Sequence, residues 1–234
     1  MQIGGLQKVT LIDYPGLLAA TVFLISCNFR CPWCYNPELV LPEKIKKQLR
    51  ISEKYFFDFL RKKKKFLEGA VLCGGEPTIN KDLPRFCRKI KKMGYLVKLD
   101  TNGSNPEMLK KLIREKLIDY VAMDIKAPLK NQKYNGVTGV EVNLNKIKKS
   151  IGLIKDSGID CEFRTTIVPG IHTKEDIIQI VREISPAKKY FLQNFRPGKT
   201  LEPSFEKEKA YSSEELTEIC RTISPYFDYC GIRE

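Results

Sequence analysis

The chain has 234 residues and a formal net charge of +13, from 41 Lys and Arg residues against 28 Asp and Glu residues. Hydrophobic residues make up 42% of it and charged residues 29%, which is typical of a folded globular domain and excludes a disordered one. The longest apolar run, residues 17–25, is too short for a membrane span of about 20 residues. The start lacks the charged-then-apolar order of a secretory signal, so we expect a cytoplasmic protein with no membrane partner.

The excess positive charge lies mostly on expected helix faces, in the runs 61–65 and 88–92. Such runs are usually solvated surface, and the alternative is a surface that attracts acidic partners. The basic residues do not alternate with aromatic ones as they do in many nucleic-acid-binding proteins. We therefore do not expect nucleic acid as a partner, and an acidic protein is favoured.

Apolar, β-rich runs alternate with amphipathic stretches along the chain. Ser52, followed by apolar residues at helical spacing, indicates the start of a helix that packs on a core. The expected strands are 18–25, 70–73, 96–99, 120–125, 161–168 and 190–195. The expected helices are 52–66, 82–93, 106–116, 143–157, 174–184 and 213–226. Segments 3–14 and 229–234 are expected to be accessory edge pieces.

Successive strand-then-helix units imply a parallel sheet with right-handed crossovers. Eight such units close a TIM barrel, so the shorter series here predicts an α/β fold, an open, partial (βα)6 barrel. No linker rich in Gly, Ser or Pro divides the chain, and no internal repeat is present. We therefore expect a single domain over residues 1–234, with its core at about 17–197.

Three cysteines follow the first expected core strand with the spacing C-x3-C-x2-C: Cys27, Cys31 and Cys34. Three thiolates on one loop can each bind one iron of a 4Fe–4S cluster and leave the fourth iron open to a substrate. The alternatives are a zinc site and three unrelated core thiols. A structural zinc site normally has four protein ligands, and the one histidine, His172, is distant in sequence. In a reducing compartment these cysteines are better explained as metal ligands than as disulfides.

Polar motifs also follow the next three strands. Gly74-Gly75-Glu76-Pro77 combines glycines that permit close approach to a ligand with a carboxylate that can pair with an ammonium group. The third expected strand ends in Asp100-Thr101-Asn102-Gly103, and the fourth ends in Met123-Asp124-Ile125-Lys126. Each motif alone could be an ordinary turn or a surface pair. Ligand groups in parallel α/β sheets gather at the carboxyl ends of strands. One site is therefore expected from Cys27, Glu76, Asp100, Asp124, Val168 and Asn194.

The cysteine loop, with Trp33 before its last ligand, resembles the signature of the radical S-adenosylmethionine (SAM) superfamily, and Gly-Gly-Glu resembles its second motif. The resemblance implies one 4Fe–4S cluster on the three cysteines, with the methionine amino and carboxylate groups of SAM on the open iron. It implies reductive cleavage of SAM to methionine and a 5′-deoxyadenosyl radical. The SAM-binding residues it implies are Trp33, near the adenine, with Gly74, Gly75, Glu76, Asp100, Thr101, Asn102 and Val168.

A narrower resemblance is to enzymes that install glycyl radicals in partner enzymes. Segments 11–16, 34–38 and 164–170 look most like the longer form of the anaerobic ribonucleoside-triphosphate reductase activating family, over residues 3–197. This implies a glycyl-radical enzyme as partner, anaerobic ribonucleotide reductase in the first place, and a flavodoxin or ferredoxin as electron donor. It implies catalytic roles for Asp124, Lys126 and Arg164. In some relatives Asp100, Thr101 and Asp124 correspond to a monovalent-cation site.

The sequence departs from that family in places. Some relatives carry a histidine near the end of the last strand, where this chain reads Leu192-Gln193-Asn194-Phe195. After the cluster, relatives often have a His or Asn-like residue at the position of Tyr35. The remaining cysteines are scattered along the chain, at positions 73, 87, 161, 220 and 230. No second cluster is therefore expected. Cys73 and Cys161 are interpreted as small core residues, and Cys220 and Cys230 could approach each other. His172 is expected on a surface loop with no role.

Two other functions are compatible with parts of the sequence. One is a radical SAM enzyme acting on a small molecule, as 7-carboxy-7-deazaguanine synthase does. The other is a non-catalytic iron–sulfur or zinc binding protein. Segments 74–76 and 100–102 argue against the latter, because a binding module needs neither an ammonium-binding carboxylate nor a ribose-binding turn.

Overall fold

The computed structural model describes residues 1–233, which form two compact units. The first contains residues 1–28, 36–101 and 105–121, and the second contains 29–35, 102–104 and the chain from 122 onward. Strand β5 (Tyr120–Asp124) is shared, with its first two residues in the first unit and the others in the second. The single domain expected over 1–234 stays a prediction.

The first unit is built on four strands that neighbour one another in chain order. β1 (Ile3–Thr10) pairs antiparallel with β2 (Ala19–Leu24), and β2, β3 (Gly69–Gly74) and β4 (Leu96–Thr101) run parallel. The register places Leu24 opposite Gly74, so the segments that follow β2 and β3 start side by side. The helices are α1 (Pro37–Val40), α2 (Pro42–Ile45), α3 (Glu53–Lys62), η1 (Pro77–Ile79), α4 (Leu83–Lys92) and α5 (Pro106–Arg114).

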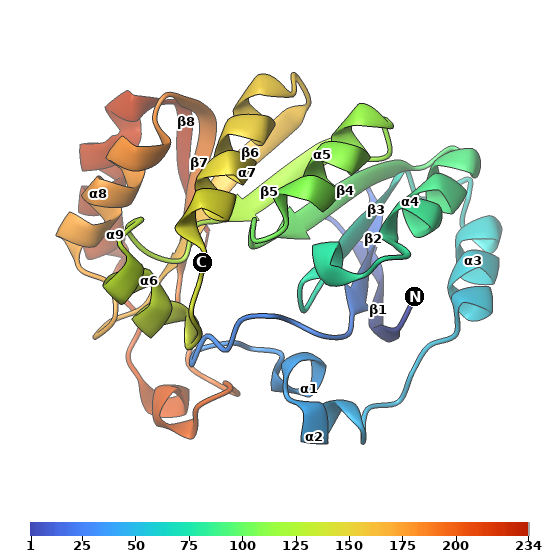
Figure 1. Cartoon of the computed structure of the whole chain (residues 1–234), viewed down its shortest axis with the longest axis horizontal. Helices are drawn as coiled ribbons and strands as arrows, with labels where there is room; N and C mark the ends of the chain where they lie inside the picture. The colour runs from blue at the N-terminus through green and yellow to red at the C-terminus, as the bar shows by residue number, and fades with distance from the viewer. Residues whose placement is uncertain (234) are drawn as a thin grey trace. The chain divides into compact units, whose positions relative to one another are not determined.

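Helices α3 and α4 lie beside the sheet of this unit (Figure 1), and an aromatic ring of one packs on an aromatic ring of the other. The hydroxyl of Ser52 caps α3 by accepting a hydrogen bond from the backbone N–H of Tyr55, as the sequence predicted. Phe56 on α3 and Phe86 on α4 are fully buried and stack with ring centroids 5.3 Å apart. Burial of these rings holds both helices on the sheet.

The second unit has a parallel sheet of β6 (Asp160–Ile167), β7 (Ala187–Asn194) and β8 (Phe227–Arg233). Helices α8 and α9 lie beside β7 and β8 (Figure 1), and each begins with a capping box, Thr173 with Asp176 and Ser212 with Glu215. The helices are α6 (Asn131–Thr138), α7 (Leu144–Asp156), α8 (Lys174–Ile184), η2 (Pro203–Lys207), α9 (Ser213–Ile223) and η3 (Ser224–Tyr226).

The expected fold class is confirmed: the chain has an α/β fold with a mostly parallel sheet. Among residues 1–233, β1 pairs as a strand with β2 alone and β8 with β7 alone, so the sheet is open. Both expected edge pieces contain edge strands, although residue 234 lies outside the described part. The helix expected over 213–226 ends at Ile223, because Pro225 cannot continue the backbone hydrogen bonding of an α-helix. Helix α6 was not predicted, because its polar sequence has no apolar stripe.

The helices of residues 1–233 include none with the length and apolar character that a membrane crossing requires.

Candidate active site

The segment before Cys27 is hydrogen-bonded to the carboxyl end of β3. The N–H of Gly75 donates to the carbonyl of Leu24, and the N–H of Glu76 donates to the carbonyl of Ser26, each at 2.8 Å. A Cβ atom on Gly75 would stand 1.9 Å from the Ser26 carbonyl oxygen. Ser26 itself has a φ of 82°, which is uncommon for a residue other than glycine. Only glycine at position 75 permits this close approach of two backbones.

The Glu76 carboxylate is buried, with 1% of the residue exposed, and is held by threonines. Its Oε1 accepts hydrogen bonds from the Thr78 N–H at 3.0 Å, from the Thr78 hydroxyl and from the Thr101 hydroxyl at 2.7 Å. Thr101 ends β4, so two residues expected in one site, from neighbouring strands, are in contact. These donors fix the orientation of the Glu76 carboxylate, which the sequence analysis predicts to pair with the ammonium group of SAM.

Asp100 has a partner that the sequence analysis missed. Lys98, two residues earlier on the same face of β4, is 1% exposed, and its ammonium group forms an ion pair with the Asp100 carboxylate. The ammonium also lies 5.8 Å from the ring centroid of Tyr120. A lysine in the middle of an apolar strand, two positions from an aspartate, was the signal available. Asn102, which follows in the second unit, closes a turn by accepting from the Ser104 N–H at 3.0 Å.

In the second unit, Asp124, Lys126 and Arg164 form a partly buried ion group. One Asp124 oxygen lies 3.0 Å from the Lys126 Nζ, and the other lies 2.5 Å from the Arg164 Nε. Burial by itself would raise the pKa of the Asp124 carboxyl, but the two cations outweigh it and hold that pKa well below its usual range. Burial would likewise lower the pKa of Lys126, which Asp124 instead raises. All three groups are therefore charged at neutral pH.

The predicted cluster ligands are the three thiols of the cysteine loop. Cys31 is buried and Cys27 and Cys34 are half-buried, and the Cys34 N–H donates to the Cys31 carbonyl at 3.0 Å. Burial raises the pKa of Cys31 to about 11, although Lys126 lowers it. Within residues 1–233 no three His, Cys, Asp or Glu side chains converge as a metal site. Soft thiolates suit iron–sulfur clusters, and their assignment as the ligands stays a prediction.

His172 does not lie on the surface, and that expectation was wrong. The residue is 1% exposed, its Nδ1 accepts from the Val168 N–H at 3.1 Å, and its Nε2 lies 2.7 Å from the Lys126 carbonyl oxygen. A carbonyl only accepts, so the ring is neutral with its proton on Nε2. Trp33 meets the ring edge-on at 5.6 Å between centroids. His172 thus contacts Val168, Lys126 and Trp33, three of the predicted site residues. No pattern in the sequence indicated this role.

The predicted site residues are divided between the two units. The first holds Cys27, Gly74, Gly75, Glu76, Asp100 and Thr101, and the second holds Cys31, Trp33, Cys34, Asn102, Asp124, Lys126, Arg164 and Val168. Cys27 and Glu76 follow the carboxyl ends of β2 and β3 in the first unit, and Asp124 ends β5 and Val168 follows β6 in the second. At the end of β7, the Nδ2 of Asn194 donates to the Tyr211 carbonyl, whereas its buried Oδ1 has no hydrogen-bond partner in the described part of the chain.

The other cysteines take up structural positions. Cys87 and Cys161 are buried and Cys73 is half-buried in β3. Cys220 on α9 and Cys230 on β8 do approach each other, with sulfur atoms 3.3 Å apart.

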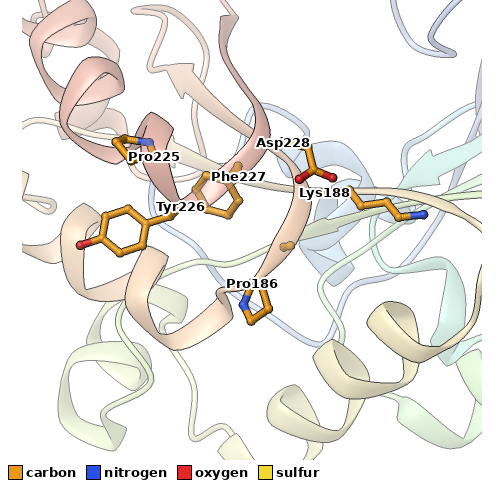
Figure 2. A pocket seen from close by; sticks show the side chains of 7 residues that line it. Pro186, Lys188, Pro225, Tyr226, Phe227 and Asp228 are labelled. Carbon is orange, nitrogen blue, oxygen red and sulfur yellow. The ribbon is translucent and has the colours of Figure 1, made fainter.

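A pocket of about 300 Å³ opens in the second unit at the amino ends of β7 and β8. Asn194 lies at the opposite, carboxyl end of β7. Figure 2 shows its lining, which comes from the amino ends of β7 and β8 and includes Pro186, Lys188, Tyr226 and Asp228. Strands of this length are about 25 Å long, so the pocket is separate from the carboxyl ends of β7 and β8.

The radical SAM superfamily model matches residues 21–184. The chain belongs to the radical SAM superfamily. It is an enzyme of this family, whose members use a 4Fe–4S cluster and SAM.

A protein of Methanocaldococcus jannaschii named "Putative glycyl-radical enzyme activating enzyme" is 36% identical over 99% of this chain and 95% of its own length. A 7-carboxy-7-deazaguanine synthase of Aquifex aeolicus is 34% identical over 38% of each chain. The solved structure of Streptococcus suis SuiB bound to S-adenosylmethionine is similar with a TM-score of 0.67 at 16% identity. That likeness covers 90% of this chain and 51% of SuiB, and it supports the fold alone.

Replacing Gly75 by Ala should disturb the segment before Cys27, because the new methyl group would overlap the Ser26 carbonyl. We expect a loss of about 1–3 kcal/mol in the free energy of unfolding, as for other overpacked sites, with a lower iron content. Denaturant unfolding and iron analysis measure the two effects. Gly152→Ala is the matched control, because nothing lies within 4 Å of its added Cβ and alanine favours helix α7. Equal effects of the two changes would contradict this account.

The chain has one Trp and one His, so Trp33 fluorescence in metal-free protein can follow the protonation of His172. Burial lowers the pKa of His172 from its ordinary 6.5, and we expect the fluorescence midpoint below that value. The contribution of the neutral ring to stability should be complete above pH 6.5 and lost as the pH falls through the lowered pKa. His172→Gln should lack the fluorescence step. A fluorescence midpoint at or above pH 6.5 would contradict a buried, neutral His172 ring.

Proposed function

We propose that this enzyme cleaves SAM reductively and forms a glycyl radical on a partner enzyme. The observation that carries the proposal is the 36% identity to the named activating enzyme, which extends over nearly the whole of both chains. The motifs that suggested this function from the sequence lie within that alignment.

The residues proposed to hold the cluster are Cys27, Cys31 and Cys34. The cluster would supply the electron that cleaves SAM to methionine and a 5′-deoxyadenosyl radical. Glu76 would bind the SAM ammonium group, and its burial and its hydrogen bonds from Thr78 and Thr101 suit that task, because they fix its direction before SAM binds.

Other residues would bind the rest of SAM. Trp33 would lie near the adenine, and the edge contact from His172 would keep its ring in place. Asp100, oriented by Lys98, would lie near the ribose or the carboxylate. Asn102 and Val168 complete the proposed binding residues. A monovalent cation at Asp100, Thr101 and Asp124 stays a prediction.

The proposed partner is anaerobic ribonucleotide reductase, with a flavodoxin or ferredoxin as electron donor in the cytoplasm. Asp124, Lys126 and Arg164 would face the target loop and hold it by charge and hydrogen bonds. Their Coulomb interactions keep all three ionised, and charge-assisted hydrogen bonds are the strong ones. The net charge of +13 would favour docking of an acidic partner, so activation should weaken as salt rises.

A second candidate function is supported by the similarity to 7-carboxy-7-deazaguanine synthase, a small-molecule radical SAM enzyme. That similarity covers 38% of the chain, against 99% for the activating enzyme. An enzyme of this kind would turn over its substrate with no protein partner present.

Protein purified without oxygen should contain about four irons per chain, as three thiolates on a cubane cluster require. Changing Cys27, Cys31 and Cys34 together to Ala should remove the iron and sulfide. Cys87→Ala is the control: that thiol is buried on α4, outside the cysteine loop, and its loss should leave the cluster intact. Iron, zinc and sulfide analyses measure the outcome. Stoichiometric zinc without sulfide would contradict the proposal.

Asp124→Ala or Lys126→Ala should reduce the glycyl-radical yield more than the uncoupled cleavage of SAM, because these side chains would face the target loop. The measurements are the glycyl signal in electron paramagnetic resonance, with anaerobic ribonucleotide reductase as target, and the 5′-deoxyadenosine released without it. An equal fall in both would assign the two residues to the SAM site instead. A wild-type protein that consumes a pterin-like substrate and gives no glycyl signal would favour the second candidate function.

A further inference from the structure

The ion group of Asp124, Lys126 and Arg164 continues further across the sheet of the second unit. Glu162, two residues before Arg164 on β6, lies on the same face of the strand, and its Oε1 is 3.8 Å from the Arg164 Nη1. Arg233 on β8 binds Glu162 through both ends of its guanidinium group, at 2.7 and 2.8 Å. Five groups of alternating charge therefore connect Lys126 with β8.

Arg233, the last of these five charged groups, is fixed by packing as well as by charge. The guanidinium carbon of Arg233 lies 3.7 Å from the ring centroid of Phe191, the residue of β7 that pairs with Arg164. Gly231 pairs with Phe191, and a Cβ at Gly231 would stand 3.1 Å from the phenylalanine ring. Bidentate pairing and stacking on an aromatic ring both need a planar guanidinium group, so lysine cannot replace Arg233.

Stability does not explain this arrangement. The Glu162 side chain is 0% exposed, so its carboxylate has lost its water. An ion pair in such a place gives little or no net stability compared with apolar side chains of similar volume, because desolvation offsets the attraction. What a buried pair does provide is orientation, since each partner is restricted to the geometry that satisfies the other.

We infer that Glu162 and Arg233 are positioning residues for Arg164. Glu162 holds one side of the Arg164 guanidinium group, and Asp124 holds its Nε. This restricts Arg164 to one rotamer, in which Arg164 shares Asp124 with Lys126. The three groups that face the target loop are thus fixed from β8. The role of Arg164 at that loop rests on the proposed function.

The first measurement is hydrogen exchange of the Arg164 Nε–H by NMR, on the purified full-length chain without a partner, with the signal assigned by its absence in Arg164→Lys. In Glu162→Gln, and in Arg233→Lys, this proton should exchange at least about tenfold faster than in wild type, because the guanidinium group is no longer held on both sides. Glu218→Gln is the matched control, since it makes the same chemical change in an exposed pair with Lys174. Unchanged exchange in Glu162→Gln would overturn the inference whatever the enzyme's function.

The second measurement is the glycyl radical formed per 5′-deoxyadenosine released, with the partner present. Glu162→Gln should lower this ratio as Arg164→Lys does, and Glu218→Gln should not. The double variant Glu162→Met, Arg233→Met separates positioning from folding, because an apolar pair can restore thermal stability without holding Arg164. If that variant kept the wild-type exchange rate and ratio, the pair would be structural only. If wild type itself gave no glycyl signal, the proposed function would fail, and the exchange rates alone would decide the inference.

Discussion

At the carboxyl ends of β2 and β3 two backbones lie in direct contact, and this contact positions the segment before Cys27 and the backbone of Glu76. The register places Gly74 opposite Leu24, and Gly75 then lies so close to Ser26 that no side chain fits between them. The hydrogen bonds made there fix the segment before Cys27 and the backbone of Glu76 together. Ordering the loop that we propose carries the cluster ligands costs conformational entropy, and this contact orders the segment at which the loop begins.

Two kinds of support surround the side chains that we propose act in the site. In the first unit a carboxylate is surrounded by hydroxyl and backbone donors, as Glu76 is by Thr78 and Thr101. In the second unit charges alternate: three cations, Lys126, Arg164 and Arg233, interleave with two carboxylates, Asp124 and Glu162. Asp124 lies between Lys126 and Arg164, and Glu162 lies between Arg164 and Arg233, so both carboxylates have cations on two sides. Both arrangements hold side chains in place before a ligand binds.

Much of the fold could be predicted because the core strands are apolar and the helices begin with capping residues. Strands such as β3 and helices such as α8 lie within a few residues of their expected limits. Helix α6 was missed because Tyr134 and Val137 alone do not make an apolar stripe. The cysteine loop and the Gly-Gly-Glu motif were recognisable because their chemistry depends on short, fixed spacings.

The supporting residues were not recognisable because their partners are distant in sequence. Glu162 and Arg233 are 71 residues apart, and only the parallel register of β6, β7 and β8 brings them together. His172 contacts the carbonyl of Lys126, 46 residues away. Every residue has a backbone carbonyl, so the sequence does not indicate which one is the partner. Lys98 was missed as well, although it could have been recognised, because it lies only two positions from Asp100 on the same strand.

We propose that the cysteine loop leaves one iron of the cluster open for SAM, and that the fixed Glu76 carboxylate binds the ammonium group of SAM. Electron–nuclear double resonance on the reduced protein tests it most directly, using SAM labelled with ¹⁵N at the methionine amino group. The account predicts a nitrogen coupling to the cluster, which changes to that of ¹⁵N on labelling. A reduced cluster that shows no nitrogen coupling, with SAM demonstrably bound to the same protein, would contradict it.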